Sequence, residues 1–135
     1  MDIVEKKHEE LVNLEKHMKR LDEELTNLEE KTNEIKNIKE SLNDIKKVKQ
    51  GTEVFFPIAN GLFLKGKLES NDKLFVNVGA GAVTEKNIEE TEAMIDEQEK
   101  ELEKYKSDII KNMTLVDEKA YEIEKEILKL TEDYK

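Results

Sequence analysis

The amino-acid sequence predicts a mostly helical α+β fold in which two long helices pair as an antiparallel coiled coil and are joined by two β-hairpins. Charged residues make up 41% of the chain and apolar residues only 36%. Even so, the apolar residues recur in a heptad pattern near both ends, which is typical of long paired helices. The single proline and all five glycines lie between residues 51 and 81. In that stretch the apolar period changes to two, which indicates strands.

The first predicted helix covers residues 1–50. Asp2 and Glu5 form a plausible N-terminal cap, and Gly51 is expected to end the helix. A slip in the heptad between Leu28 and Ile38 predicts a local overwinding of the coiled coil. The apolar residues before and after it are spaced mostly three and four apart: Leu11, Leu14, Met18, Leu21, Leu25 and Leu28, then Ile35, Ile38, Leu42 and Ile45.

The middle segment, residues 51–84, predicts four strands in two hairpins. Turns are expected at 59–61 and 79–81, with a further turn at 70–72 between the hairpins. Phe55, Phe63 and Phe75 place aromatic rings on the face opposite the main apolar set. So short a segment cannot cover a sheet that is apolar on both faces, so we expect other subunits to cover it. The main apolar set occupies even-numbered positions: Val54, Phe56, Ile58, Leu62, Leu64, Leu68, Leu74, Val76 and Val78.

The second predicted helix covers residues 85–135, and the three segments together form one structural domain. Asn87 and Glu90 predict a capping box at its start. Antiparallel pairing would place Leu28 near Ile109 and Leu21 near Val116. One seam position repeats every seven residues at Ile88, Ile95, Leu102, Ile109, Val116, Ile123 and Leu130. The other is expected at Tyr105, Met113, Ala120, Ile127 and Tyr134.

Composition and charge argue against several classes of function. The net charge of −10 disfavours nucleic acid as a ligand, because phosphate binding needs a basic surface. The chain has no cysteine, which excludes disulfides and thiol catalysis and fits a reducing compartment. No leader pattern and no apolar run of membrane-spanning length is found. A cytoplasmic protein without membrane contact is therefore expected.

The sequence offers no catalytic, metal or cofactor site. The 79–84 segment precedes a helix and resembles a fragment of a dinucleotide-binding loop, but it lacks the third glycine and a hairpin turn is favoured. His8 and His17 are nine residues apart, which does not suit a metal pair on one helix face. No set of nucleophile, base and acid can be assembled. We therefore expect a protein that is not an enzyme and that uses no cofactor.

The free end of the predicted helical pair, where the start of the first helix meets the end of the second, carries more apolar residues than one partner helix can cover. One interpretation is tighter packing that resists fraying, and the other is a surface that binds apolar polypeptide. The residues concerned are Ile3, Val4, Leu11, Val12, Ile127, Leu128, Leu130 and Tyr134.

Two stretches of the middle segment carry a family resemblance. EVFFPIANGLFLKGKLE at 53–69 and KLFVNVGAGAVTEK at 73–86 resemble the central segment of prefoldin α-class subunits. The resemblance implies an ATP-independent holdase whose strands join a β-barrel between subunits, and whose coiled-coil ends hold unfolded proteins for a group II chaperonin. The assembly surface would comprise Val54, Phe55, Phe56, Phe63, Leu64, Phe75, Val76, Val78 and Val83.

The subunits that would complete this assembly are left open by the sequence. They are β-class prefoldin subunits or further copies of this chain in a homo-oligomer or filament. The alternative function is a scaffolding coiled-coil protein that assembles through its β segment and holds no unfolded protein.

Overall fold

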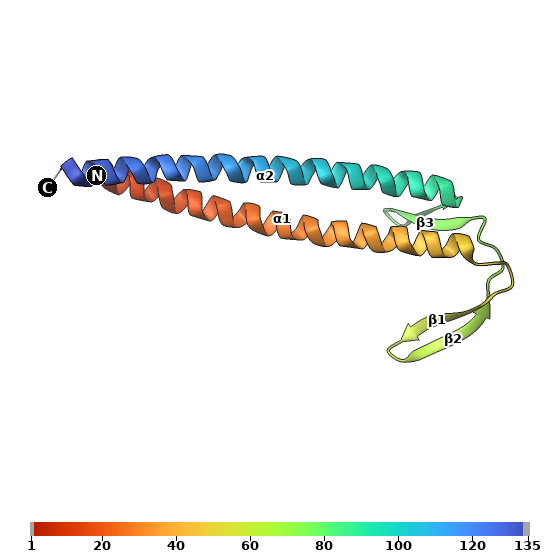
Figure 1. The fold of residues 1–135 in the computed structure, drawn as a ribbon. Coiled ribbons are helices and arrows are strands. Elements are labelled where there is room, and N and C mark those ends of the chain that lie inside the picture. Colours follow the sequence, from red (N-terminus) through yellow and green to blue (C-terminus); the bar gives the residue numbers. More distant parts are fainter. Residues whose placement is uncertain (1, 134–135) are drawn as a thin grey trace. The chain divides into compact units, whose positions relative to one another are not determined.

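The computed structural model describes residues 2–133 and confirms the predicted fold class. Two long helices flank two β-hairpins (Figure 1). In chain order the elements are α1 (Ile3–Lys47), β1 (Glu53–Ala59), β2 (Leu62–Lys67), β3 (Leu74–Gly79), β4 (Ala82–Lys86) and α2 (Ile88–Asp133).

Backbone packing divides the chain into two compact units. We call residues 1–32 with 101–135 the terminal unit, and residues 33–100 the hairpin unit. The terminal unit contains the first part of α1 and the last part of α2, which run side by side (Figure 1). The hairpin unit contains the remaining turns of both helices and all four strands.

The predicted caps explain where both helices begin. At the start of α1, the Val4 amide donates to Asp2 Oδ1 at 3.4 Å. Before α2, the Glu90 amide donates to Asn87 Oδ1 at 2.7 Å, and the Asn87 amide donates to Glu90 Oε1 at 3.3 Å. This reciprocal pair is a capping box, which satisfies amides that have no partner inside the helix.

The end of α1 differs from the prediction. The helix ends at Lys47 and not at Gly51, because its last carbonyl groups find a partner outside the helix. The side-chain amide of Asn71, between the two hairpins, donates to the carbonyls of Ile45 at 2.9 Å and Val48 at 3.0 Å. A C-terminal helix end needs such donors, and this one arrives from 23 residues further along the chain.

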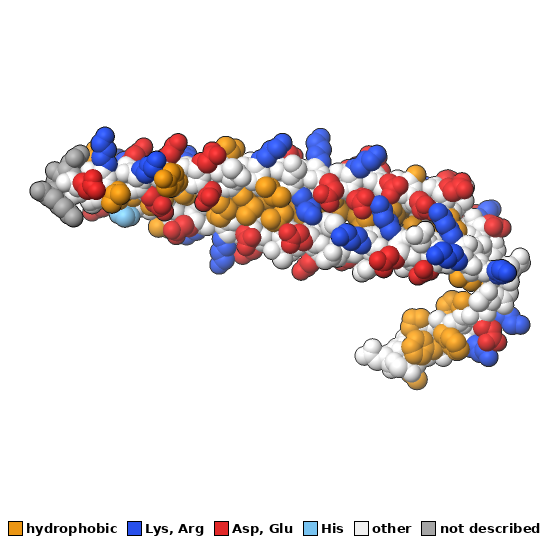
Figure 2. Space-filling view, in the orientation of Figure 1, with side chains coloured by type: hydrophobic (Ala, Val, Ile, Leu, Met, Phe, Trp, Pro, Cys, Tyr) orange, Lys and Arg blue, Asp and Glu red, His pale blue; other side chains and the backbone are white. Residues whose placement is uncertain are grey.

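The seam of the terminal unit buries apolar side chains from both helices. Its buried centre is a cluster of Leu21, Leu28, Ile109 and Val116, which contains both of the predicted opposing pairs. Each fully buried aliphatic side chain contributes about 1.5–3 kcal/mol before conformational entropy is subtracted. Figure 2 shows hydrophobic side chains between the two helices of this unit, flanked by charged ones. Half-buried residues pack around the cluster: Leu14, Met18, Leu25, Leu102 and Met113.

The predicted slip in the α1 heptad is wrong. Thr32 is buried and Lys39 is half-buried, whereas Ile38 is exposed. The buried and half-buried positions therefore keep the alternation of three and four through Leu28, Thr32, Ile35, Lys39 and Leu42. The Thr32 hydroxyl donates to the Leu28 carbonyl at 2.8 Å, so this polar group is satisfied inside the seam.

A second correction concerns the α2 seam. Tyr105 is 51% exposed as a residue, whereas Lys106 is half-buried and its side chain is only 19% exposed. Lys106 therefore takes the seam position that the sequence assigned to Tyr105. Its methylene stem covers the seam, and its ammonium group lies 3.8 Å from the Glu103 carboxylate.

The strands form two separate antiparallel sheets, β1–β2 and β3–β4, as predicted. Phe56 faces Leu64 in the first register and Val76 faces Thr84 in the second. Both hairpins turn on the expected residues, and Gly61 adopts a left-handed φ of 76° that favours glycine. The 79–81 segment is a hairpin turn between β3 and β4 and not the start of a nucleotide-binding unit.

Candidate interaction surfaces

We call the apolar side chains on the four strands the hairpin surface. Val54 and Val76 are half-buried and the other members are exposed. Ile58 and Leu62 were expected on a core face of the sheet, but both are exposed. Figure 2 shows hydrophobic side chains uncovered on the β1–β2 hairpin. The surface comprises Val54, Phe55, Phe56, Phe63, Leu64, Phe75, Val76, Val78 and Val83.

The two faces of the β1–β2 hairpin differ in character. One face carries Phe56 opposite Leu64, and the Phe56 ring lies over Gly66, where a Cβ atom would come within 2.7 Å of it. A side chain at this glycine would force the ring away. The other face carries Phe63 beside an ion pair between Lys65 and Glu53, 3.3 Å apart.

Each hairpin also has unpaired edges. Among the residues that the structure describes, each strand pairs on one side only. A two-stranded hairpin is at best marginally stable in water, and open edges with apolar faces are surfaces on which another chain can pair. The geometry therefore suits association of the hairpins with further strands.

The end surface is formed by the apolar residues near both chain ends. Val4, Leu11, Ile127 and Leu130 are half-buried, as members of the seam. Three others are exposed off the seam: Ile3, Val12 and Leu128. Tyr134, the last predicted member of this surface, lies outside the described residues.

Tyr121 belongs to the end surface but was missed in the sequence. It is exposed and lies seven residues before Leu128, at the same heptad position. The sequence contained the signal that could have identified Tyr121, because Tyr121 and Leu128 each directly follow a seam residue. Lys125 places its ammonium nitrogen 4.5 Å from the centre of the Tyr121 ring, which is a cation–π geometry.

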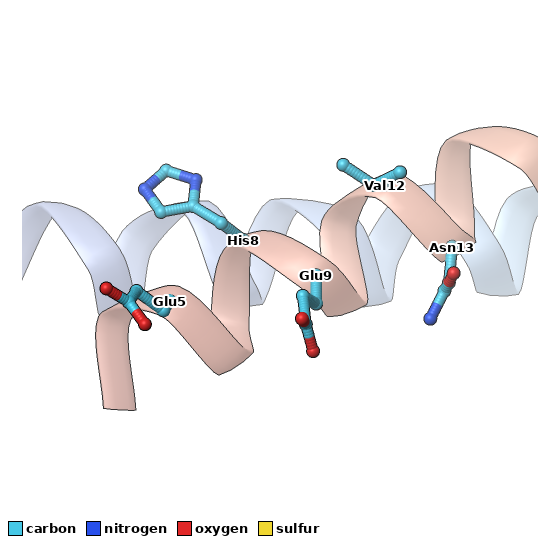
Figure 3. A pocket seen from close by; sticks show the side chains of 5 residues that line it. All are labelled: Glu5, His8, Glu9, Val12 and Asn13. Carbon is cyan, nitrogen blue, oxygen red and sulfur yellow. The ribbon is translucent and has the colours of Figure 1, made fainter. Parts of the chain in front are cut away.

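An open depression on α1 borders Val12. Its lining comprises Glu5, His8, Glu9, Val12 and Asn13. Figure 3 shows His8 and Val12 on one side of α1, and Glu9 and Asn13 on the other. His8 and His17 are both exposed. The carboxylates of Glu5 and Glu9 therefore line the same depression as the exposed valine.

A polar cluster occupies the seam of the hairpin unit. Lys39 lies 2.8 Å from Glu99 and 3.0 Å from Asp96, and Lys46 pairs with Glu92. The hydrogen bonds to Glu99 and then Asp96 raise the pKa of Lys39 above its ordinary value. Charges that already pair with one another in this way stabilise a helix–helix register more readily than they perform acid–base chemistry.

The described residues show neither a metal-binding cluster nor a membrane-spanning helix. Residues 2–133 contain no group of three or more metal-ligating side chains. No described helix combines the length and the apolar character that a bilayer crossing requires.

Comparison with known proteins decides the family. The model of the family described as "Prefoldin subunit" matches residues 14–133. This chain belongs to the prefoldin subunit family. A curated relative, prefoldin subunit alpha from Methanobrevibacter smithii, is 33% identical over 64 residues. That match covers 47% of this chain and 44% of the relative, so it spans less than half of the relative's length.

A solved prefoldin structure has the same fold. It is described as filamentous PFD from Methanocaldococcus jannaschii, determined by cryo-electron microscopy. The TM-score is 0.76 at 20% sequence identity, and the match covers 88% of this chain and 98% of the other. The predicted resemblance to the prefoldin family is thus confirmed. The name of the curated relative agrees with the α class.

Proposed function

We propose that this prefoldin chain is an ATP-independent molecular chaperone that assembles through its hairpins and captures unfolded polypeptide with the end surface. Membership of the prefoldin family supports a chaperone role, and a non-enzymatic one. The observation that carries the proposal is the exposure of Val12, Tyr121 and Leu128 next to a seam that already has enough apolar residues to close. Such surplus apolar surface marks an interaction site.

Assembly is the first part of the proposal. The hairpin surface would be covered by the strands of neighbouring subunits, in a β-barrel or along a filament. Residues 53–86 contain four acidic and four basic side chains, so further copies of this chain meet no net electrostatic repulsion at this surface. β-class prefoldin subunits are the other candidate partners.

Capture is the second part of the proposal. Several helical pairs in one assembly would present several end surfaces to one client, and multivalent binding raises the effective affinity of weak contacts. Clients held in this way would pass to a group II chaperonin. The binding cycle needs no nucleotide, since it uses only the exchange of apolar contacts.

The deciding experiment follows the light scattering of a guanidinium-denatured enzyme diluted into buffer with this chain and no ATP. A variant lacking 1–12 and 121–135, and with them the whole end surface, is measured beside it, after sizing has shown that both assemble equally. We expect the full chain to suppress scattering and the trimmed variant to lose most of that effect. Equal suppression by both would contradict capture at the end surface.

A structural filament is the second candidate function. It is favoured by the filamentous state of the Methanocaldococcus jannaschii structure and by the open edges of both hairpins here. This candidate predicts long polymers of the purified chain in electron micrographs and no effect on the scattering of the denatured enzyme.

A further inference from the structure

Three exposed apolar side chains form one patch on the terminal unit. Val12, Tyr121 and Leu128 are all exposed, and we call them the end patch. Each directly follows a half-buried seam residue, and these are Leu11, Ala120 and Ile127. In an antiparallel pair, equivalent heptad positions of the two helices lie on the same side of the seam. The three side chains therefore share one side of the terminal unit.

Carboxylates outnumber lysines around the end patch: six carboxylates lie one helical turn from a patch residue, against two lysines, Lys16 and Lys125. Glu124 lies within one helical turn of both Tyr121 and Leu128, since residues three and four apart are neighbours on a helix surface. The other exposed carboxylates one turn from a patch residue are Glu9, Glu15, Asp117, Glu118 and Glu132. Figure 2 shows acidic groups among the hydrophobic ones near this end of the helical pair.

The negative charge is concentrated in the terminal unit. Its sequence contains 20 acidic and 13 basic residues, a net charge of −7 out of −10 for the chain. Residues 53–86, by contrast, are balanced at four and four. The ammonium group of Lys125 already lies 4.5 Å from the centre of the Tyr121 ring, so the attraction of a cationic segment depends on the surrounding carboxylates and not on this ring.

We infer that the end patch selects its clients by charge and prefers apolar segments that carry lysine or arginine over those that carry aspartate or glutamate. This inference rests on the proposed capture of polypeptide. Apolar contacts with Val12, Tyr121 and Leu128 supply the affinity, and the surrounding carboxylates attract cationic segments and repel anionic ones. Basic polypeptides in the unfolded state are the chemical class of client that this surface fits.

The test uses two labelled synthetic peptides with the same leucine and tyrosine positions, one with lysine and the other with glutamate at the remaining charged positions. Fluorescence anisotropy measures their binding to the assembled chain. We expect the lysine peptide to bind at least about tenfold more tightly at low salt. The difference should shrink when salt rises from about 0.01 M to about 1 M, which shortens the Debye length from about 30 Å to about 3 Å.

Two matched variants locate the binding site. Leu128 and Leu115 are each 62% exposed on α2, but Leu115 lies off the end patch. We expect Leu128→Ser to lose at least about tenfold in affinity for the lysine peptide and Leu115→Ser to keep it. Glu124→Gln should reduce the ratio of the affinities for the lysine and glutamate peptides, and the lysine peptide should still bind.

The outcomes separate this inference from the function on which it rests. Equal binding of the two peptides by a chain that suppresses the scattering of the denatured enzyme would overturn charge selection alone. If Leu128→Ser and Leu115→Ser lose equal affinity for the lysine peptide, the end patch is not the site where the peptide binds. A chain that binds neither peptide and suppresses no scattering would overturn both proposals.

Discussion

The seam of the terminal unit and the hairpin surface are both rich in apolar residues, but only the seam is covered by its own chain. Leu21, Leu28, Ile109 and Val116 are buried between two helices, whereas Phe55, Phe63 and Phe75 stay exposed on the strands. A helix presents a single apolar stripe, which one partner helix can cover. A hairpin with apolar residues on both faces needs further layers, and residues 51–86 are too few to supply them. The difference shows which surface requires other subunits.

The largest effect is expected when the hairpin surface is made polar. Changing Phe55, Phe63 and Phe75 together to serine removes the aromatic stripe that we expect neighbouring subunits to cover. Analytical ultracentrifugation should show loss of the assembly and a species near the chain mass of 15.7 kDa, with helix content preserved in circular dichroism. Leu115→Ser, exposed on the helical pair, is the control and should assemble normally. A triple variant that assembles like the wild type would show that the hairpins are not the assembly surface.

A substitution that leaves a cavity in the seam should lower the stability of the helical pair, but the hairpins should still be able to assemble. Leu28→Ala removes a side chain from the buried cluster and should lower the free energy of unfolding by about 2–5 kcal/mol in urea titration. Tyr105→Ala, at an exposed position, should change it by no more than about 0.5 kcal/mol. A comparable loss in both variants would mean that Tyr105 belongs to the seam, as the sequence suggested.

The link between the hairpins and α1 should contribute an intermediate amount. Asn71→Asp replaces an amide donor by a carboxylate next to the carbonyls of Ile45 and Val48. Loss of these hydrogen bonds, with a negative charge at a helix C-terminus, should lower stability by about 1–2 kcal/mol. Asn37→Asp, exposed on α1, serves as the control. Thermal unfolding followed by circular dichroism compares them, and equal melting temperatures would show that Asn71 does not stabilise the helix end.

The smallest expected effect is the loss of stability at alkaline pH that comes from the polar cluster in the hairpin unit. Because the carboxylates of Glu99 and Asp96 raise the pKa of Lys39, the folded state holds this proton more tightly than the unfolded state. The resulting stability is fully present below the ordinary lysine pKa of about 10.4 and is lost as pH rises through the raised value. The melting temperature of the wild type should therefore fall more steeply above that pH than that of Lys39→Met. Parallel curves would contradict a contribution from this cluster.

The sequence predicted the element order, both helix caps and the hairpin turns, because each depends on neighbouring residues. It also predicted the apolar seam, since an amphipathic helix shows its buried stripe directly in its period. The capping box of Asn87 and Glu90 is an example of a motif that is complete within four residues.

The errors arose where a polar residue lies in the seam. Thr32 and Lys39 keep the α1 heptad in step, but the more hydrophobic Ile38 suggested a slip. In α2, Lys106 covers the seam with its methylenes and Tyr105 does not. Both cases show that heptad phase is a better guide to burial than hydrophobicity at a single position.

Long-range features could not be predicted from local pattern. The contact of Asn71 with the end of α1 joins residues 23 and 26 positions apart, and no local signal marks it. Among the proposed site residues, the sequence identified Val12 and Leu128 by their surplus hydrophobicity but missed Tyr121, because the polar hydroxyl of tyrosine made it look like an ordinary surface residue.

The most direct test of the account is amide hydrogen exchange of the wild type and of the triple phenylalanine-to-serine variant, measured side by side. We predict slow exchange in the α1 and α2 seam of both proteins, since the chain covers that seam itself. The strands between residues 53 and 86 should exchange slowly in the assembled wild type and rapidly in the variant. Strands that remain equally protected in an unassembled variant would contradict the claim that the hairpins depend on neighbouring subunits.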